Sequence, residues 1–101
     1  MIDRIKETEK ITERSKRSFE DYQYELGEIQ MVSISWDKEY LEYTTIVQGE
    51  FESITLTGFS IGYKGEGPSG LMWLLDRCKI PYKKESITGK VDDKGRMEFK
   101  K

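Results

Sequence analysis

Apolar side chains recur at every second position between residues 28 and 57. A period of two is typical of strands that bury one face. Two short polar connections, Asp37–Glu39 and Gly49–Glu50, interrupt the pattern, and connections this short join antiparallel neighbours. The segment therefore predicts an antiparallel β-meander of three or four strands, where the fourth would come from the alternation that continues beyond Gly58. The alternating residues are Val32, Ile34, Trp36, Leu41, Tyr43, Thr45, Val47, Ile54 and Leu56, continued by Phe59, Ile61 and Tyr63.

Residues 1 to about 26 predict a helix, because they contain neither Gly nor Pro and are rich in Glu, Lys and Arg. Gly27 is the expected helix stop. Phe19, Tyr22 and Leu26 form a stripe at helical spacing, so the C-terminal half should pack on the domain. The N-terminal half has little to bury and is expected to project into solvent or meet a partner. Residues 1–27 are thus interpreted as a possible oligomerisation or partner arm, and residues 28–101 as a single α+β domain.

A second helix is predicted after Pro68, where apolar residues return at i, i+3, i+4 and i+7. Pro68 suits a first turn, and Pro81 should end the helix near Lys79. A C-terminal β-hairpin is expected around the turn at 92–95, with Met97 and Phe99 in its returning strand. The predicted fold class is therefore α+β: an N-terminal helix, an antiparallel meander, a second helix packed on the sheet and a C-terminal hairpin. The second helix carries its stripe on Leu71, Leu74, Leu75 and Cys78.

The composition excludes several classes of function. A net charge of −2 argues against a nucleic-acid binder that acts by bulk charge. The chain has no His, which removes the commonest zinc ligand and general base, and its single Cys excludes an internal disulfide. No stretch approaches the ~20 apolar residues of a membrane span, and the polar N-terminus does not resemble a signal peptide. We therefore expect a cytoplasmic protein that is not an enzyme, carries no cofactor, and contacts neither membrane nor nucleic acid.

Glycine is concentrated in one place, since five of the nine glycines lie between Gly58 and Gly70. Gly65, Gly67 and Gly70 satisfy G-x-G-x-x-G, but a dinucleotide fold needs a parallel sheet and more chain than this. A Walker loop would need Lys at the position of Pro68. The general physics of anion binding still applies, because a helix N-terminus and inward amides attract negative charge. Alternatively, the glycines serve only to turn the chain from strand to helix.

The anion-binding interpretation makes specific assignments in this segment. Backbone groups of Gly65, Gly67 and Ser69 are expected to bind a phosphate, Lys64 to add charge, and Tyr63 or Trp73 to stack on a ring. The surroundings favour this, because residues 58–101 carry ten basic and six acidic side chains. Cys78 lies on the apolar stripe, so a buried, inert thiol is expected there. The scattered carboxylates fall at turns or exposed strand positions and are interpreted as solvated surface.

Residues 57–76 resemble an uncharacterised domain family of bacteria and their phages. The resemblance rests on Gly58-Phe59, Gly62-Tyr63, Gly65, Gly67-Pro68 and the Leu-rich helix that follows. Members carry a run similar to G-F-x-W-G-Y-x-G-x-G-P, and Ile61 stands where the family usually has Trp. The resemblance covers a fifth of the chain and implies a phage or mobile-element setting, with no established activity attached.

Two functions are consistent with these observations. The first is a phage-encoded, non-enzymatic protein that captures a small anionic, nucleotide-like ligand at the glycine-rich loop, as a counter-defence sponge. The second is a protein–protein inhibitor or adaptor that acts through the N-terminal helix and an exposed aromatic surface near Trp73. In both cases we expect a homo-oligomer, because a long helix with few apolar residues gains from a partner.

Overall fold

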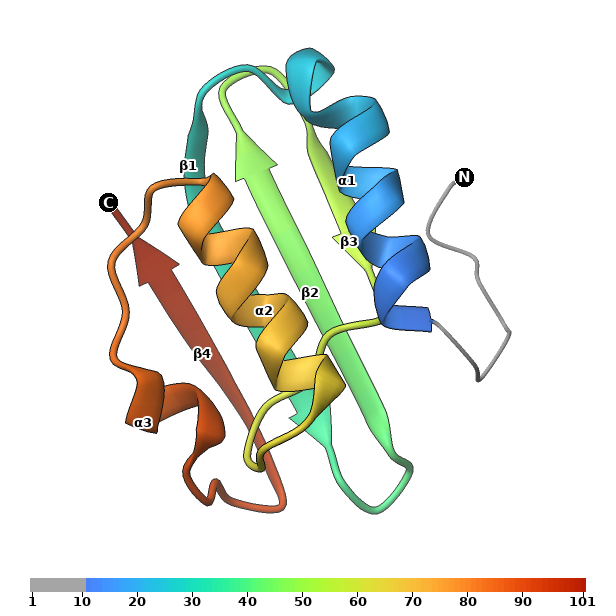
Figure 1. Ribbon diagram of the computed structural model, residues 1–101, viewed down its shortest axis with the longest axis vertical. Coiled ribbons are helices and arrows are strands. Elements are labelled where there is room, and N and C mark those ends of the chain that lie inside the picture. Colours follow the sequence, from blue (N-terminus) through green and yellow to red (C-terminus); the bar gives the residue numbers. More distant parts are fainter. Residues whose placement is uncertain (1–10) are drawn as a thin grey trace.

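The computed structural model describes residues 11–101. The chain forms three helices and one four-stranded sheet over these residues, and the α+β class predicted from the sequence is confirmed (Figure 1). Every strand pair is antiparallel, and the strands lie in the order β3-β2-β1-β4. The elements are α1 (Ile11–Leu26), β1 (Ile29–Asp37), β2 (Glu42–Gly49), β3 (Ser53–Leu56), α2 (Glu66–Arg77), α3 (Lys84–Thr88) and β4 (Lys94–Lys100).

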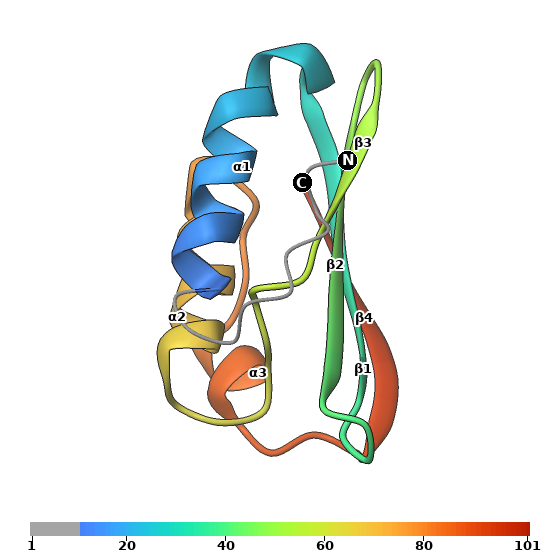
Figure 2. The same cartoon turned by 90° about the vertical axis from the view of Figure 1, so that its right-hand side faces the viewer.

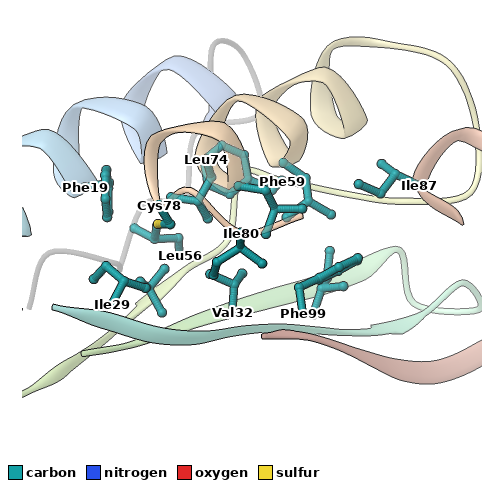
Figure 3. Packing of buried hydrophobic residues seen from close by; sticks show 14 of the residues in the cluster. Phe19, Ile29, Val32, Leu56, Phe59, Leu74, Cys78, Ile80, Ile87 and Phe99 are labelled. Carbon is teal, nitrogen blue, oxygen red and sulfur yellow. The ribbon is translucent and has the colours of Figure 1, made fainter. Parts of the chain in front are cut away.

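All three helices lie on one face of the sheet, so the molecule has two layers (Figure 2). The core fills the space between them. Val32 and Phe99 project from the sheet toward Phe59 and Leu74 of the opposite layer (Figure 3). Alternation along each strand places most apolar residues on this covered face and leaves mainly polar residues, together with Ile46, on the other. The predicted packing of the second helix on the sheet is therefore confirmed.

The predicted meander is confirmed as far as Leu56. β1 pairs with β2, where Trp36 lies opposite Tyr43, and β2 pairs with the short strand β3. The expected fourth strand from Phe59 to Tyr63 is wrong, because residues 57–65 form a loop. Phe59 and Ile61 are nevertheless buried. Their alternation reflects burial of loop side chains in the core and not a ladder of strand hydrogen bonds.

The expected C-terminal hairpin is also wrong. The chain forms α3 at Lys84–Thr88, and β4 pairs with β1, with Phe99 opposite Val32. β1 therefore pairs with β2 along one edge and with β4, the last strand of the chain, along the other. Two side-chain hydrogen bonds fix the segment that leads into β4. Trp36 Nε1, near the C-terminal end of β1, donates to the Asp92 carbonyl at 2.8 Å. Lys38 Nζ, one residue after β1, donates to the Val91 carbonyl at 2.8 Å.

α1 packs over its whole described length. Phe19 and Leu26 are buried as predicted, but Thr12 and Ser15 are buried as well. The N-terminal half was expected to project into solvent or meet a partner, but Thr12 and Ser15 pack within this chain, and residues 1–10 lie outside the described part. Small polar side chains replace apolar ones here: Thr12 Oγ1 donates to the Gly58 carbonyl at 2.6 Å, and the Gly58 N–H donates to Ser15 Oγ at 2.9 Å.

α2 ends in a Schellman motif, close to the expected position. The Ile80 N–H donates to the Leu75 carbonyl at 3.0 Å, and the Lys79 N–H donates to the Asp76 carbonyl at 3.1 Å. This geometry requires a left-handed residue at the position after the cap, and Lys79 has φ 59°. Glycine is the residue that adopts this conformation without steric cost.

Replacing Lys79 with Gly is expected to raise the free energy of unfolding by about 0.5–1 kcal/mol, because relief of left-handed strain exceeds the added entropy of the unfolded chain. Lys79→Ala is the matched control, since it removes the same exposed side chain but keeps the Cβ. Urea denaturation of both variants measures the effect. Equal midpoints for the two variants would contradict the assignment of strain to Lys79.

Candidate functional site

The glycine-rich loop and the start of α2 border a pocket. Its volume is about 500 Å³, and two separate segments of the chain form its walls. The loop and α2 contribute Lys64, Gly65, Ser69 and Met72, while α3 contributes Lys84, Glu85 and Thr88. Two cationic side chains and one carboxylate therefore face a hollow large enough for a small molecule. We call this hollow the lysine pocket.

The N-terminus of α2 adds partial positive charge at the same place. α2 begins after Gly65 without a side-chain capping hydrogen bond. The first intrahelical bond runs from the Ser69 N–H to the Gly65 carbonyl at 3.0 Å. Pro68 has no N–H, so the amides of Glu66 and Gly67 are the donors that helix geometry leaves without an intrahelical partner. An anion in the lysine pocket would lie close to this end of the helix dipole.

The six residues predicted from sequence do not gather in one place. Lys64, Gly65 and Ser69 line the lysine pocket, whereas Tyr63 and Gly67 line a second hollow. Trp73 lines neither of these two hollows. We therefore keep Lys64, Gly65 and Ser69 as the core of the candidate site.

Trp73 instead lies at the contact between α1 and α2. Its ring packs edge-on against Phe19, with centroids 6.1 Å apart. Lys16 Nζ lies 5.4 Å from the ring centroid and Arg77 Cζ 4.7 Å from it. Arg77 also pairs with Glu20 of α1 at 2.9 Å. The tryptophan thus stabilises helix–helix packing through aromatic and cation–π contacts.

The α3 side of the pocket was missed from the sequence. The sequence predicts a hairpin around the turn at 92–95, and no site residue is predicted among Lys84, Glu85 and Thr88. A helix of five residues is too short to show a helical period, so the sequence offered no pattern to detect it. The one available signal was the density of basic residues after position 58, which includes Lys83 and Lys84.

Gly67 is required by packing and not by backbone conformation. Among the glycines, Gly27 and Gly62 are the ones with positive φ. An added Cβ at position 67 would overlap Ser60 Oγ and lie 3.2 Å from the Tyr63 hydroxyl. Ser60 is buried, and its hydroxyl hydrogen-bonds the Tyr63 hydroxyl at 2.7 Å. The start of α2 therefore presses directly on the loop that leads into it.

Gly67→Val is expected to lower the free energy of unfolding by about 1–3 kcal/mol, the usual cost of overpacking a tight contact. Glu66→Ala, one residue earlier and exposed, should change it by about 0.5 kcal/mol or less. Thermal melts of the two variants measure the difference. Equal melting temperatures would show that Ser60 can move away from a larger side chain at position 67 without loss of stability.

Cys78 and Tyr43 both have a pKa above the usual value for their group. Cys78 is buried as expected, and burial raises the pKa of its thiol to about 11. Burial, together with the nearby Tyr63 hydroxyl, raises the pKa of Tyr43 above its usual value.

Within residues 11–101, no group of three or more Cys, Asp or Glu side chains is placed to hold a metal ion. No helix in that range is long and apolar enough to cross a membrane.

Comparison with protein-family models, with curated proteins and with solved structures finds no match to this chain. The assignment of function therefore rests on the residues and geometry described above.

Proposed function

We propose that this protein binds a small anionic, nucleotide-like ligand in the lysine pocket, without catalysing a reaction. One observation carries the proposal: Lys64 and Lys84 come from separate segments and face the same hollow at the N-terminus of α2. Two full charges and the positive end of a helix favour a phosphate group. The volume of about 500 Å³ falls in the range of small-molecule sites.

Each lining residue has a chemical role in this proposal. The ammonium groups of Lys64 and Lys84 bind phosphate oxygens. The hydroxyls of Ser69 and Thr88 supply neutral donors, and the Met72 thioether offers an apolar contact to a base or ring. Glu85 repels a second phosphate but accepts a hydrogen bond from a sugar hydroxyl, so the pocket favours a nucleoside phosphate over a bare polyanion.

We further propose that ligand capture serves a phage against a nucleotide signal of its host. The support is the resemblance of residues 57–76 to a domain family of bacteria and phages. A sponge of this kind requires binding without turnover, and a chain without His whose one thiol is buried is consistent with that requirement.

Calorimetric titration with mono-, di- and cyclic nucleotides tests the proposal. We expect at least one of them to bind with 1:1 stoichiometry per chain, weakening as salt is raised because the contacts are ionic. Mass spectrometry of the denatured protein provides an independent check through co-purified nucleotide. Absence of heat with every nucleotide at millimolar concentration would refute the proposal.

The protein–protein alternative has one observation in its favour. Tyr24 projects from α1 with 87% of its surface exposed, and Phe51 in the turn before β3 is 71% exposed. Exposed aromatic side chains are enriched at interfaces. If the Tyr24→Ser variant no longer binds a partner protein that the Lys64→Glu variant still binds, the inhibitor or adaptor function is favoured over ligand capture.

Self-association remains a prediction, and the structure changes where it should occur. α1 already packs its apolar side within its own chain, so the uncovered face of the sheet is the larger available surface (Figure 2). Ile46 is exposed there, between Ser33 of β1 and Thr55 of β3. We expect a dimeric mass by light scattering at tens of micromolar, and a monomer for Ile46→Lys. A monomeric mass for the unmodified chain would contradict the prediction.

A further inference from the structure

A second hollow lies beside the glycine-rich loop, and its chemistry differs from that of the lysine pocket. Its volume is about 390 Å³. It is bordered by the start of α1, the turn between β1 and β2, the beginning of β2, and the first residues of α2. Tyr43, Tyr63 and Glu66 are the lining residues that determine what it could bind. We call this hollow the tyrosine groove.

Charge separates the two hollows. Glu66 is the sole charged side chain among the lining residues described for the tyrosine groove, and neither Lys nor Arg lines it. The lysine pocket has two ammonium groups and one carboxylate. Among residues 11–101 the groove therefore offers an anion no cationic partner, and a ligand of the opposite charge is favoured there.

Two tyrosines line this groove, and the hydroxyl of one of them has a hydrogen-bond partner. The Tyr63 hydroxyl hydrogen-bonds Ser60 at 2.7 Å, yet 47% of the Tyr63 surface remains exposed. Tyr43 is half-buried on β2 and lines the same hollow as Tyr63. The rings and hydroxyl oxygens of the two tyrosines present partial negative charge to a ligand.

Two further observations support a binding site in the tyrosine groove. Thr57 lines it, and the buried Thr57 hydroxyl has no hydrogen-bond partner among residues 11–101. Buried hydroxyls are normally satisfied, so this oxygen has a hydrogen-bonding capacity that the described residues do not use. Leu41 lies in the turn that borders the groove. It has φ 55°, and 78% of its surface is exposed. A strained, exposed Leu provides an apolar contact for a ligand's alkyl part.

We propose that the tyrosine groove binds an organic cation, an alkylammonium or guanidinium group. The cation would lie against the rings of Tyr43 and Tyr63, with the Glu66 carboxylate as its counter-ion and Thr57 Oγ1 as an additional acceptor. Cation–π contact and a carboxylate together are a known basis of ammonium recognition. The alkyl stem would pack toward Leu41. This site uses residues other than those of the lysine pocket and does not depend on nucleotide binding.

The cationic group can come from two sources: a free amine, or the Lys or Arg side chain of a peptide. Amide NMR spectra of the full chain are recorded during titration with n-butylammonium, with N-acetyl-lysine-methylamide, and with n-butanol as a neutral control of the same alkyl length. We expect saturable shifts for the two cations at the amides of Gly58, Tyr63 and Gly67, and none at equal concentration of n-butanol. Tighter binding of the lysine derivative assigns the site to a peptide, and equal affinity assigns it to free amines.

Two variants test the assignment of residues. Glu66→Gln keeps the size of the side chain but removes its charge, and it should weaken n-butylammonium binding about five- to tenfold. Tyr63→Leu should weaken it to a similar extent, because it removes one ring. Glu52→Gln, at an exposed acid in the turn before β3, is the matched control and should bind like the unmodified chain.

Three results would overturn the proposal. The first is equal shifts with n-butanol, which would mark a simple apolar groove. The second is the absence of saturation with either cation, and the third is unchanged affinity in both Glu66→Gln and Tyr63→Leu while their spectra retain native dispersion. None of these bears on nucleotide titration at the lysine pocket, so failure here is distinguishable from failure of the proposed function.

Discussion

Replacing Gly58 with Ala is expected to lower the free energy of unfolding by about 2–4 kcal/mol, the combined scale of an overpacked contact and a disrupted buried hydrogen bond. An added Cβ would overlap the backbone carbonyl of Ile11 and lie 2.5 Å from Ser15 Oγ. Backbone atoms of a helix cannot rotate away as a side chain can. The loop and α1 would have to separate, and the two hydrogen bonds that Gly58 makes with Thr12 and Ser15 would lengthen.

Gly65→Ala is the matched control for this substitution. Its backbone is extended, with φ 172°, which any residue adopts. The nearest obstacle is the ring of the partly exposed Tyr63 at 2.8 Å, and that side chain can move. Thermal unfolding should show a loss of roughly 10–20 °C for Gly58→Ala and a few degrees at most for Gly65→Ala. Similar losses in both variants would show that the α1 contact at Gly58 is not a tight one.

Lys64→Glu is expected to weaken nucleotide binding by roughly 5- to 150-fold, which corresponds to the ~1–3 kcal/mol of a charge-assisted contact. Lys64 lines the pocket, so reversal replaces attraction of a phosphate with repulsion at short range. Lys84→Glu should act in the same direction from the opposite wall. The fold should survive both, since each side chain is exposed.

Lys100→Glu is the control for charge reversal as such. Lys100 is the last residue of β4, whose arrowhead points away from α3 in Figure 1, and its Nζ is 3.8 Å from a carboxylate oxygen of Glu98. Beyond a Debye length of ~8 Å, its charge is largely screened at physiological salt. Calorimetric titration of the three variants measures the contrast. If Lys64→Glu and Lys100→Glu bind equally well, the ligand does not occupy the lysine pocket.

The parts of the fold that sequence predicts are those determined by local periodicity. Alternation from Val32 to Leu56 is sufficient to identify the meander, because each strand buries one face and each connection is short. The stripe from Leu71 to Cys78 identifies α2 for the same reason. The structure adds a packing role for Gly70 within this helix, because a Cβ there would lie 2.5 Å from Thr12 Cγ2 of α1.

The parts that sequence misses depend on partners distant in the chain. Nothing near Met97 or Phe99 indicates that their partner strand is β1 and not residues 87–91. Burial of Thr12 and Ser15 is equally hidden, because it depends on the backbone polar groups of Gly58. In the candidate site, the loop residues Lys64, Gly65 and Ser69 were predicted, whereas the α3 wall required the three-dimensional structure.

The position of β4 bears on the order in which the sheet can assemble. β1 is an interior strand, yet one of its two neighbours comes from the last residues of the chain, with Met31 paired to Lys100. Such non-local pairing slows folding, because the intervening chain must be ordered before the contact stabilises it. Until then β1 presents an unpaired edge with Val32 and Ile34 beside it, which can template pairing with another copy. The charged side chains that alternate along β4, from Lys94 to Lys100, then protect the finished sheet from the same edge-to-edge association.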